Sequence, residues 1–182
     1  TTALLRATSG SPSGGTPTAD ALRRVAESLR GTAGKTFVIL ATDGGPNCNS
    51  AASCSFDKCM PNIENYGRCA ADGPFNCCVP PEGAVEDCLD AAATNSAVSA
   101  LKTADIPVYV VGLPGTAAYG ALLDQLAVSG GTALATSPKY YLIGTATTNP
   151  LLGALKKIAA KIVATCEFKL KEPPAAPNRV NV

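Results

Sequence analysis

Residues 36–45, TFVILATDGG, decide how this chain is interpreted. Their apolar run lacks the polar alternation of a half-exposed strand, which predicts a strand over residues 37–42 that is buried on both faces. The strand ends at the carboxylate of Asp43, and two glycines follow at once. Ligands of open α/β sheets bind at the carboxyl ends of parallel strands, so Asp43 is a candidate site residue. An ordinary Asp-Gly turn is the alternative interpretation.

Helical and strand patterns alternate along most of the chain. Helices are expected from a Thr16 N-cap and Pro17 at the first helical position, over residues 84–104, from Tyr119 to the glycine pair 130–131, and from Asn149-Pro150 with a stripe of Leu151, Leu155, Ile158 and Ile162. Further strands are expected at residues 106–113, within residues 132–143, and at residues 166–170. This order predicts an α/β fold with a mostly parallel sheet and helices on both faces.

The informative counts are eight cysteines and no histidine. Seven cysteines lie between residues 48 and 88, and no CxxC pair occurs among them. An even, clustered set without metal-binding spacing favours disulfides over free or metal-bound thiols. Residues 46–83 also lack any sustained period, which predicts a long disulfide-rich insertion. Disulfides form in oxidising compartments, so the expected location is extracellular, at the cell surface or periplasmic.

Composition and motifs argue against several functional classes. The absence of histidine excludes Ser-His-Asp and Cys-His catalysis. Residues 29–36, LRGTAGKT, fail as a phosphate-binding loop because Leu29 replaces the first glycine and a strand follows. The glycines at 112, 115 and 120 lack dinucleotide-binding spacing. We therefore expect no enzyme.

Two classes of partner are also unexpected. The net charge is only +1, with positive charges scattered along the chain, so nucleic acid is not an expected partner. The Lys156, Lys157 and Lys161 cluster is expected on the solvated side of its helix. No apolar run approaches the roughly 20 residues that cross a bilayer, so this segment is not expected to insert into a membrane.

Two segments carry a resemblance to a known family. SGGTPTADAL (residues 13–22) and VILATDGG (residues 38–45) resemble two of the three segments that form the metal-ion-dependent adhesion site of von Willebrand factor type A domains. IPVYVVGL followed by LLDQLAVSGGTAL is similar to the next strand, helix and Gly-Gly turn of that family. The resemblance implies a Rossmann-like fold in which Thr16 and Asp43 help to hold a divalent cation.

The implied function is adhesion. The resemblance implies an extracellular protein-binding module whose cation, Mg²⁺ or another divalent ion such as Mn²⁺ or Ca²⁺, binds an acidic side chain of a protein ligand. Oxygen ligands suit such hard cations, and the hydroxyl of Thr16 adds no charge that would neutralise the ion. A metal-independent structural domain of a secreted or cell-surface assembly is the alternative.

The chain departs from the family pattern in one segment. The Asp-x-Ser-x-Ser motif, which should precede Thr16 by several dozen residues, does not occur. We therefore expect a second chain or a missing N-terminal segment to complete the sheet, because a sheet from this sequence alone would expose a long edge. The expected domain covers residues 1–170 as a partial von Willebrand factor A-like unit. Residues 171–182 are expected to form a Pro-rich tail or linker.

Overall fold

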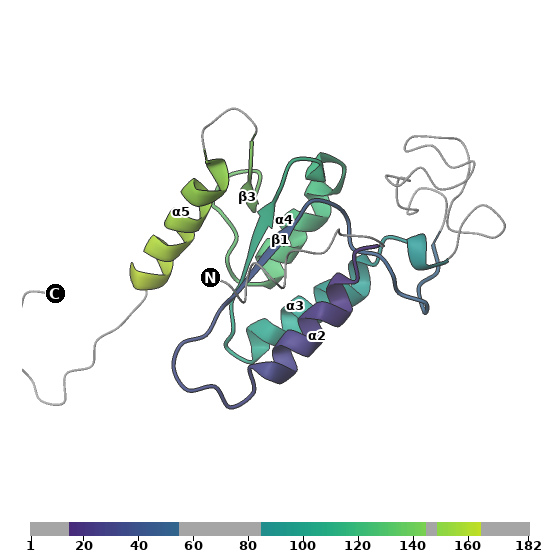
Figure 1. Ribbon diagram of the computed structural model, residues 1–182, viewed down its shortest axis with the longest axis horizontal. Coiled ribbons are helices and arrows are strands. Elements are labelled where there is room, and N and C mark those ends of the chain that lie inside the picture. Colours follow the sequence, from purple (N-terminus) through teal and green to yellow (C-terminus); the bar gives the residue numbers. More distant parts are fainter. Residues whose placement is uncertain (1–14, 55–84, 145–148, 165–182) are drawn as a thin grey trace, which may run out of the picture. The chain divides into compact units, whose positions relative to one another are not determined.

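The computed structural model describes residues 15–54, 85–144 and 149–164 (Figure 1). The chain divides into two compact units, Thr1–Thr145 and Ala146–Val182. The sheet and the helices around it belong to the first unit. The second unit contains α5 (Pro150–Ala164). The expected strand at 166–170 and the Pro-rich tail lie outside the described residues.

The described residues form a parallel sheet of three strands. These are β1 (Val38–Thr42), β2 (Val108–Gly112) and β3 (Tyr141–Leu142), in the order β1-β2-β3. Thr42 is opposite Gly112, and Gly112 is opposite Leu142, so the three carboxyl ends meet at one edge of the sheet. A parallel sheet flanked by helices confirms the predicted α/β class.

The buried strand of this sheet is β2. Every residue of β2 is buried, as its unbroken apolar sequence predicts. The same prediction is wrong for β1, whose residues alternate in exposure. Ile39 is 38% exposed, whereas Leu40 packs against the core. The reason is position: within the described residues β1 pairs with β2 alone, so one of its faces and its outer edge are not enclosed.

Three helices of the first unit cover one face of the sheet. They are α2 (Thr18–Ser28), α3 (Ala91–Thr103) and α4 (Gly120–Ser129), and Figure 1 shows α2 and α3 side by side. Their buried side chains form the core with one face of β2: Leu22, Val98, Leu101, Val108, Val110, Leu122, Leu123 and Leu126. The predicted cover of helices on both faces is thus described for one face only.

Aromatic side chains occupy the other face of the sheet. Side chains alternate along a strand, so Tyr109 points away from the core that contains Val108 and Val110. Its ring meets the ring of Phe37 edge-on at a centroid distance of 6.3 Å and that of Tyr141 at 6.4 Å. Phe37 is itself 39% exposed. These rings stabilise the register of neighbouring strands.

Two helix predictions need correction. The helix expected from residue 84 begins only at Ala91, because a short 3-10 helix, η2 (Val85–Asp87), and an irregular turn precede it. In α5, Ala154 and Ile158 are buried, whereas Leu151 and Leu155 of the predicted stripe are exposed. Lys156, Lys157 and Lys161 are exposed, as predicted. Among the described residues, no helix is long and apolar enough to cross a membrane.

Candidate site at the carboxyl end of the sheet

Asp43 lies immediately after β1, at the edge where the carboxyl ends of the strands meet. Its side chain is exposed. The preceding residue, Thr42, is buried, and its hydroxyl donates to the carbonyl oxygen of Gly44 at 2.9 Å. The amide of Leu113, just after β2, donates to the carbonyl oxygen of Thr42 at 2.8 Å. Asp43 therefore projects from a turn that is fixed to both β1 and β2.

Thr16 is hydrogen-bonded to Asn47, four residues after Asp43. The amide of Thr16 donates to Oδ1 of Asn47, and the amide of Asn47 donates back to the carbonyl oxygen of Thr16 at 2.9 Å. These two residues are 31 positions apart. We call this reciprocal pair of hydrogen bonds the Thr16–Asn47 clasp. The clasp brings the loop that carries Thr16 to the loop that carries Asp43.

The predicted N-cap role of Thr16 is wrong. Helix α2 begins at Thr18, Pro17 occupies the cap position, and no side-chain hydrogen bond caps the helix. The amide of Thr18 donates to the carbonyl oxygen of Thr16 at 2.7 Å. The clasp explains the shift, since it holds the backbone of Thr16 against Asn47 rather than at the start of the helix.

Two glycines permit these close approaches. A Cβ atom on Gly15 would lie 2.2 Å from Sγ of Cys48 and 2.5 Å from Oδ1 of Asn47. A Cβ atom on Gly45 would lie 2.7 Å from two ring carbons of Tyr119. Contacts below about 3 Å do not occur between real Cβ atoms and their neighbours. Only glycine fits at either position without displacement of its neighbours.

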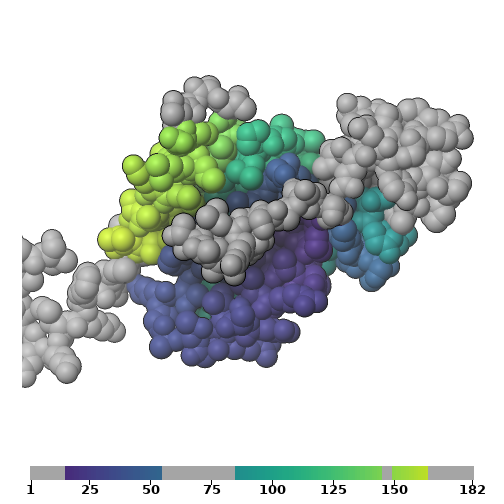
Figure 2. All heavy atoms as spheres, in the orientation of Figure 1, coloured from purple at the N-terminus to yellow at the C-terminus, as the bar shows by residue number. Residues whose placement is uncertain are grey.

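The described segments on either side of residues 55–84 lie next to each other. We call residues 46–54 and 85–90 the insertion stem, and Figure 2 shows its blue and teal halves in contact. The amide of Asp90 donates to the carbonyl oxygen of Pro46 at 2.8 Å, and the amide of Cys48 donates to that of Glu86 at 2.6 Å. Nδ2 of Asn49 donates to the buried carboxylate of Asp90 at 3.1 Å.

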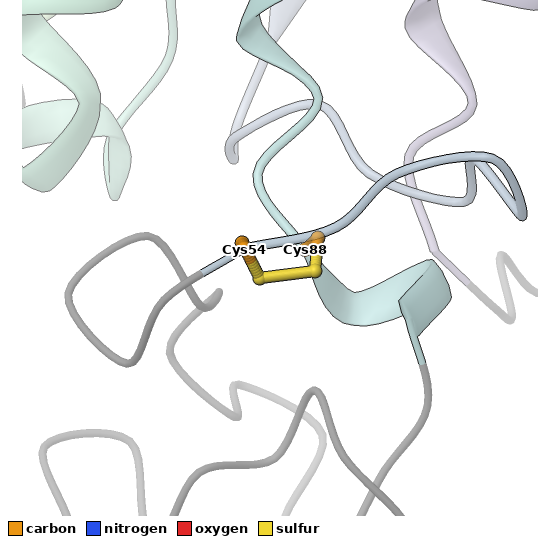
Figure 3. Close-up of a disulfide and its surroundings, with 2 residues drawn as sticks. All are labelled: Cys54 and Cys88. Atoms are coloured by element: carbon orange, nitrogen blue, oxygen red, sulfur yellow. A yellow bond between two sulfur atoms is a disulfide. The ribbon is translucent and has the colours of Figure 1, made fainter.

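A disulfide also closes the stem. Cys54 and Cys88 are bonded across 34 positions, with their Cα atoms 5.8 Å apart (Figure 3). Cys88 is 1% exposed. This bond agrees with the prediction that the cysteines form disulfides, and the cysteines at 59, 69, 77, 78 and 166 lie outside the described residues. The described segments on either side of residues 55–84 therefore form a base that is closed by a disulfide, only a few residues after Asp43.

A buried tyrosine lies beside this base. Tyr119 is 7% exposed, and its ring lies against Gly45, which Leu89 also approaches. Its hydroxyl has no hydrogen-bond partner among the described residues. Burial raises the pKa of the Tyr119 hydroxyl above the ordinary tyrosine value of 10.0, because the ionised form would lose its solvation.

Asp43, at the sheet edge, and Thr16, in the loop joined to it by the clasp, both carry hard oxygen atoms. Mg²⁺ retains several waters and often takes only one or two protein carboxylates, so the Asp43 carboxylate and the Thr16 hydroxyl fit its chemistry. Thr16 is half-buried and Asp43 is exposed, which leaves room for water on the ion. Within residues 15–54, 85–144 and 149–164, no group of three or more Cys, Asp or Glu side chains is placed to hold a metal. A cation here would depend on hydroxyl, carbonyl and water ligands beside Asp43.

Sequence reasoning missed Asn47 and Tyr119. Asn47 follows Pro46 in a stretch that is typical of turns, and its partner Thr16 is distant in the sequence. Tyr119 is the first residue of a predicted helix, and that prediction does not indicate contact with the loop after Asp43. A signal was present in the two glycines that follow Asp43, because paired glycines mark positions where a backbone is approached closely.

Comparisons with protein-family models, with curated proteins and with solved structures gave no match. The similarity to von Willebrand factor type A domains therefore rests on the quoted segments alone. The parallel sheet and the position of Asp43 after β1 are compatible with that similarity.

Proposed function

We propose that this chain is an extracellular protein-binding module of the von Willebrand factor A type, with a Rossmann-like fold and a divalent cation at the carboxyl edge of its sheet. The side chains of Thr16 and Asp43 coordinate the ion. Mg²⁺ is the preferred ion, with Mn²⁺ or Ca²⁺ as substitutes. The observation that supports this most is the Thr16–Asn47 clasp. It joins the two loops whose sequences resemble the adhesion site.

The proposed site suits an acidic protein ligand. A neutral hydroxyl and a single carboxylate leave a divalent ion with uncompensated positive charge. A carboxylate from the partner protein replaces a bound water and completes the coordination. The insertion of residues 46–83 starts three residues after Asp43, so it shapes the surface that such a partner meets. The disulfide Cys54–Cys88 of the stem supports an oxidising, extracellular location.

Equilibrium dialysis of the full chain against Mg²⁺ and Mn²⁺ tests this function. We expect Asp43→Ala and Thr16→Val to weaken binding at least about tenfold. The control is Glu27→Ala, which removes an exposed carboxylate in the last turn of α2, at the opposite end of that helix from Thr16. Absence of binding by the unmodified chain, or equal binding by all four proteins, contradicts the proposed site.

A metal-independent structural domain is the second candidate. The stapled stem and the absence of a three-residue acidic or cysteine cluster in the described ranges favour it. In that case a partner protein binds equally well in the presence of EDTA and of Mg²⁺. The cation-dependent module instead requires that EDTA abolish binding and that Mg²⁺ restore it.

We also propose that a second chain or a further N-terminal segment completes the sheet next to β1. Phe37 and Ile39 support this, since both are more than one-third exposed on or beside a strand that pairs, among the described residues, with β2 alone. Sedimentation velocity of the chain tests the first source. A dimer that Ile39→Lys dissociates supports a second copy of this chain as the partner, and a monomer excludes such a copy.

A further inference from the structure

We infer that Asn47 is the positioning residue of the candidate site: it fixes the backbone of Thr16 and thereby sets the place of the Thr16 hydroxyl relative to Asp43. This inference rests on the proposed function where it concerns cation affinity. Its statement about the Thr16 backbone stands on the structure alone. It concerns a residue that contributes no ligand atom of its own.

The clasp holds Thr16 by its backbone. Both hydrogen bonds use backbone atoms of Thr16, its amide and its carbonyl oxygen. The Thr16 hydroxyl therefore takes no part in the clasp. On the other side, one bond uses the side chain of Asn47 and the other uses its backbone amide. Two bonds to one residue fix both the distance and the orientation of the Thr16 peptide units.

Asn47 is itself held in place by the contacts of its neighbours. Its neighbour Pro46 accepts a hydrogen bond from Asp90, and its other neighbour Cys48 donates one to Glu86. The stem is closed further along by the Cys54–Cys88 disulfide. Asn47 is thus held within the stem, and it in turn holds Thr16.

The position and the chemistry of residue 47 both suit the clasp. Asn47 follows Asp43 by four positions, so the clasp joins Thr16 to the loop that carries the other proposed ligand. The side chain must place a hydrogen-bond acceptor next to the Thr16 amide. Alanine has no acceptor, whereas aspartate keeps one of the same length. Asn47→Ala should therefore remove the side-chain bond of the clasp and leave only the backbone bond, whereas Asn47→Asp should retain both.

The experiment measures hydrogen exchange at the Thr16 amide together with Mn²⁺ binding. In Asn47→Ala we expect the Thr16 amide to exchange about fivefold faster or more, because its acceptor is lost. We expect Mn²⁺ affinity to fall about tenfold, as when a partner of a metal ligand is removed. Asn47→Asp should keep the slow exchange of the unmodified chain.

The matched control is Asn49→Ala. It also removes an amide from the stem, but that side chain bonds to Asp90 and not to Thr16. The disulfide and the backbone hydrogen bonds of the stem remain, so Thr16 exchange and Mn²⁺ affinity should stay unchanged. If Asn47 had a merely structural role, Asn47→Ala and Asn49→Ala would both lower the melting temperature. Exchange at the Thr16 amide would then be no faster than elsewhere in the chain.

Each other outcome has a defined meaning. Unchanged Thr16 exchange in Asn47→Ala overturns the inference, as does faster exchange with undiminished Mn²⁺ affinity. If Asn47→Ala does not fold, fast Thr16 exchange in folded Asn47→Asp overturns it and slow exchange supports it. If the unmodified chain binds no Mn²⁺, the proposed function fails, and the exchange data alone decide whether Asn47 fixes Thr16.

Discussion

The ring of Tyr119 lies directly against Gly45, which leaves no space for a side chain on the glycine: a Cβ atom there would stand 2.7 Å from two ring carbons. Leu89 approaches the same point to 2.8 Å. Tyr119 belongs to the short 3-10 helix η3 (Thr116–Tyr119), which precedes α4. The loop after Asp43 is thus packed onto two segments far along the chain.

Gly45→Ala is expected to destabilise the domain by roughly 1–3 kcal/mol, because the added methyl group overpacks a closed contact. Urea unfolding followed by circular dichroism measures this change. Gly153→Ala is the control: its Cβ meets nothing within 4 Å, and it lies inside helix α5. Alanine there should leave stability unchanged or raise it slightly. Equal stability of Gly45→Ala and the unmodified chain would show that the Tyr119 contact is not formed.

Tyr119→Phe should alter stability mainly at alkaline pH. Burial raises the pKa of the folded Tyr119 hydroxyl, so above pH 10 the unfolded chain loses a proton that the folded chain keeps. Stability therefore falls as pH rises from the ordinary tyrosine value toward the raised one. Tyr119→Phe removes the contribution of this hydroxyl to the loss of stability at high pH. Burial also raises the pKa of the Tyr141 hydroxyl, so the contribution of Tyr141 to the loss of stability remains in the variant.

Melting temperatures of Tyr119→Phe and the unmodified chain, compared at pH 7 and pH 11, provide the measurement. At pH 7 the two should differ little, because the hydroxyl has no partner among the described residues. At pH 11 the variant should be the more stable protein. A variant that is clearly less stable at pH 7 would reveal a hydrogen bond to Tyr119 and refute this account of its burial.

The two faces of the sheet should respond differently to truncation. Val110 of β2 is fully buried in the core, so Val110→Ala should cost about 2 kcal/mol or more. Ile39 of β1 is 38% exposed, and Ile39→Ala should cost less than about 1 kcal/mol despite removing more atoms. Denaturant unfolding of both variants tests the order. A larger loss at Ile39 means that this face is covered in solution.

Sequence patterns predicted the positions of helices and strands better than the burial of each element. The apolar sequences of β1 and β2 look alike, yet only β2 is buried throughout, because burial depends on the neighbours that a strand acquires. The Gly130-Gly131 pair does end α4, and Gly131 adopts a positive φ of 73°. Local signals such as glycine pairs act through backbone conformation, so they can be read from the sequence.

The candidate site was predictable only in part. Asp43 was placed correctly at the end of a parallel strand, since this position follows from strand order. The N-cap prediction for Thr16 failed because a contact 31 positions away outweighs a local preference. Asn47 could not have been selected, because nothing in its neighbourhood indicates a distant partner. Contacts between loops require the coordinates.

Paramagnetic broadening by Mn²⁺ in the amide NMR spectrum of the full chain tests the cation site most directly, because it reports where the ion lies. We expect substoichiometric Mn²⁺ to broaden the amides of Thr16 and Gly44 first and that of Gly115 soon after. Gly115 is close to Asp43, since a Cβ atom added to it would lie 3.0 Å from the carbonyl oxygen of Asp43. Excess Mg²⁺ should reverse the effect. Broadening centred on other carboxylates, or none at these amides, would contradict a cation held by Thr16 and Asp43.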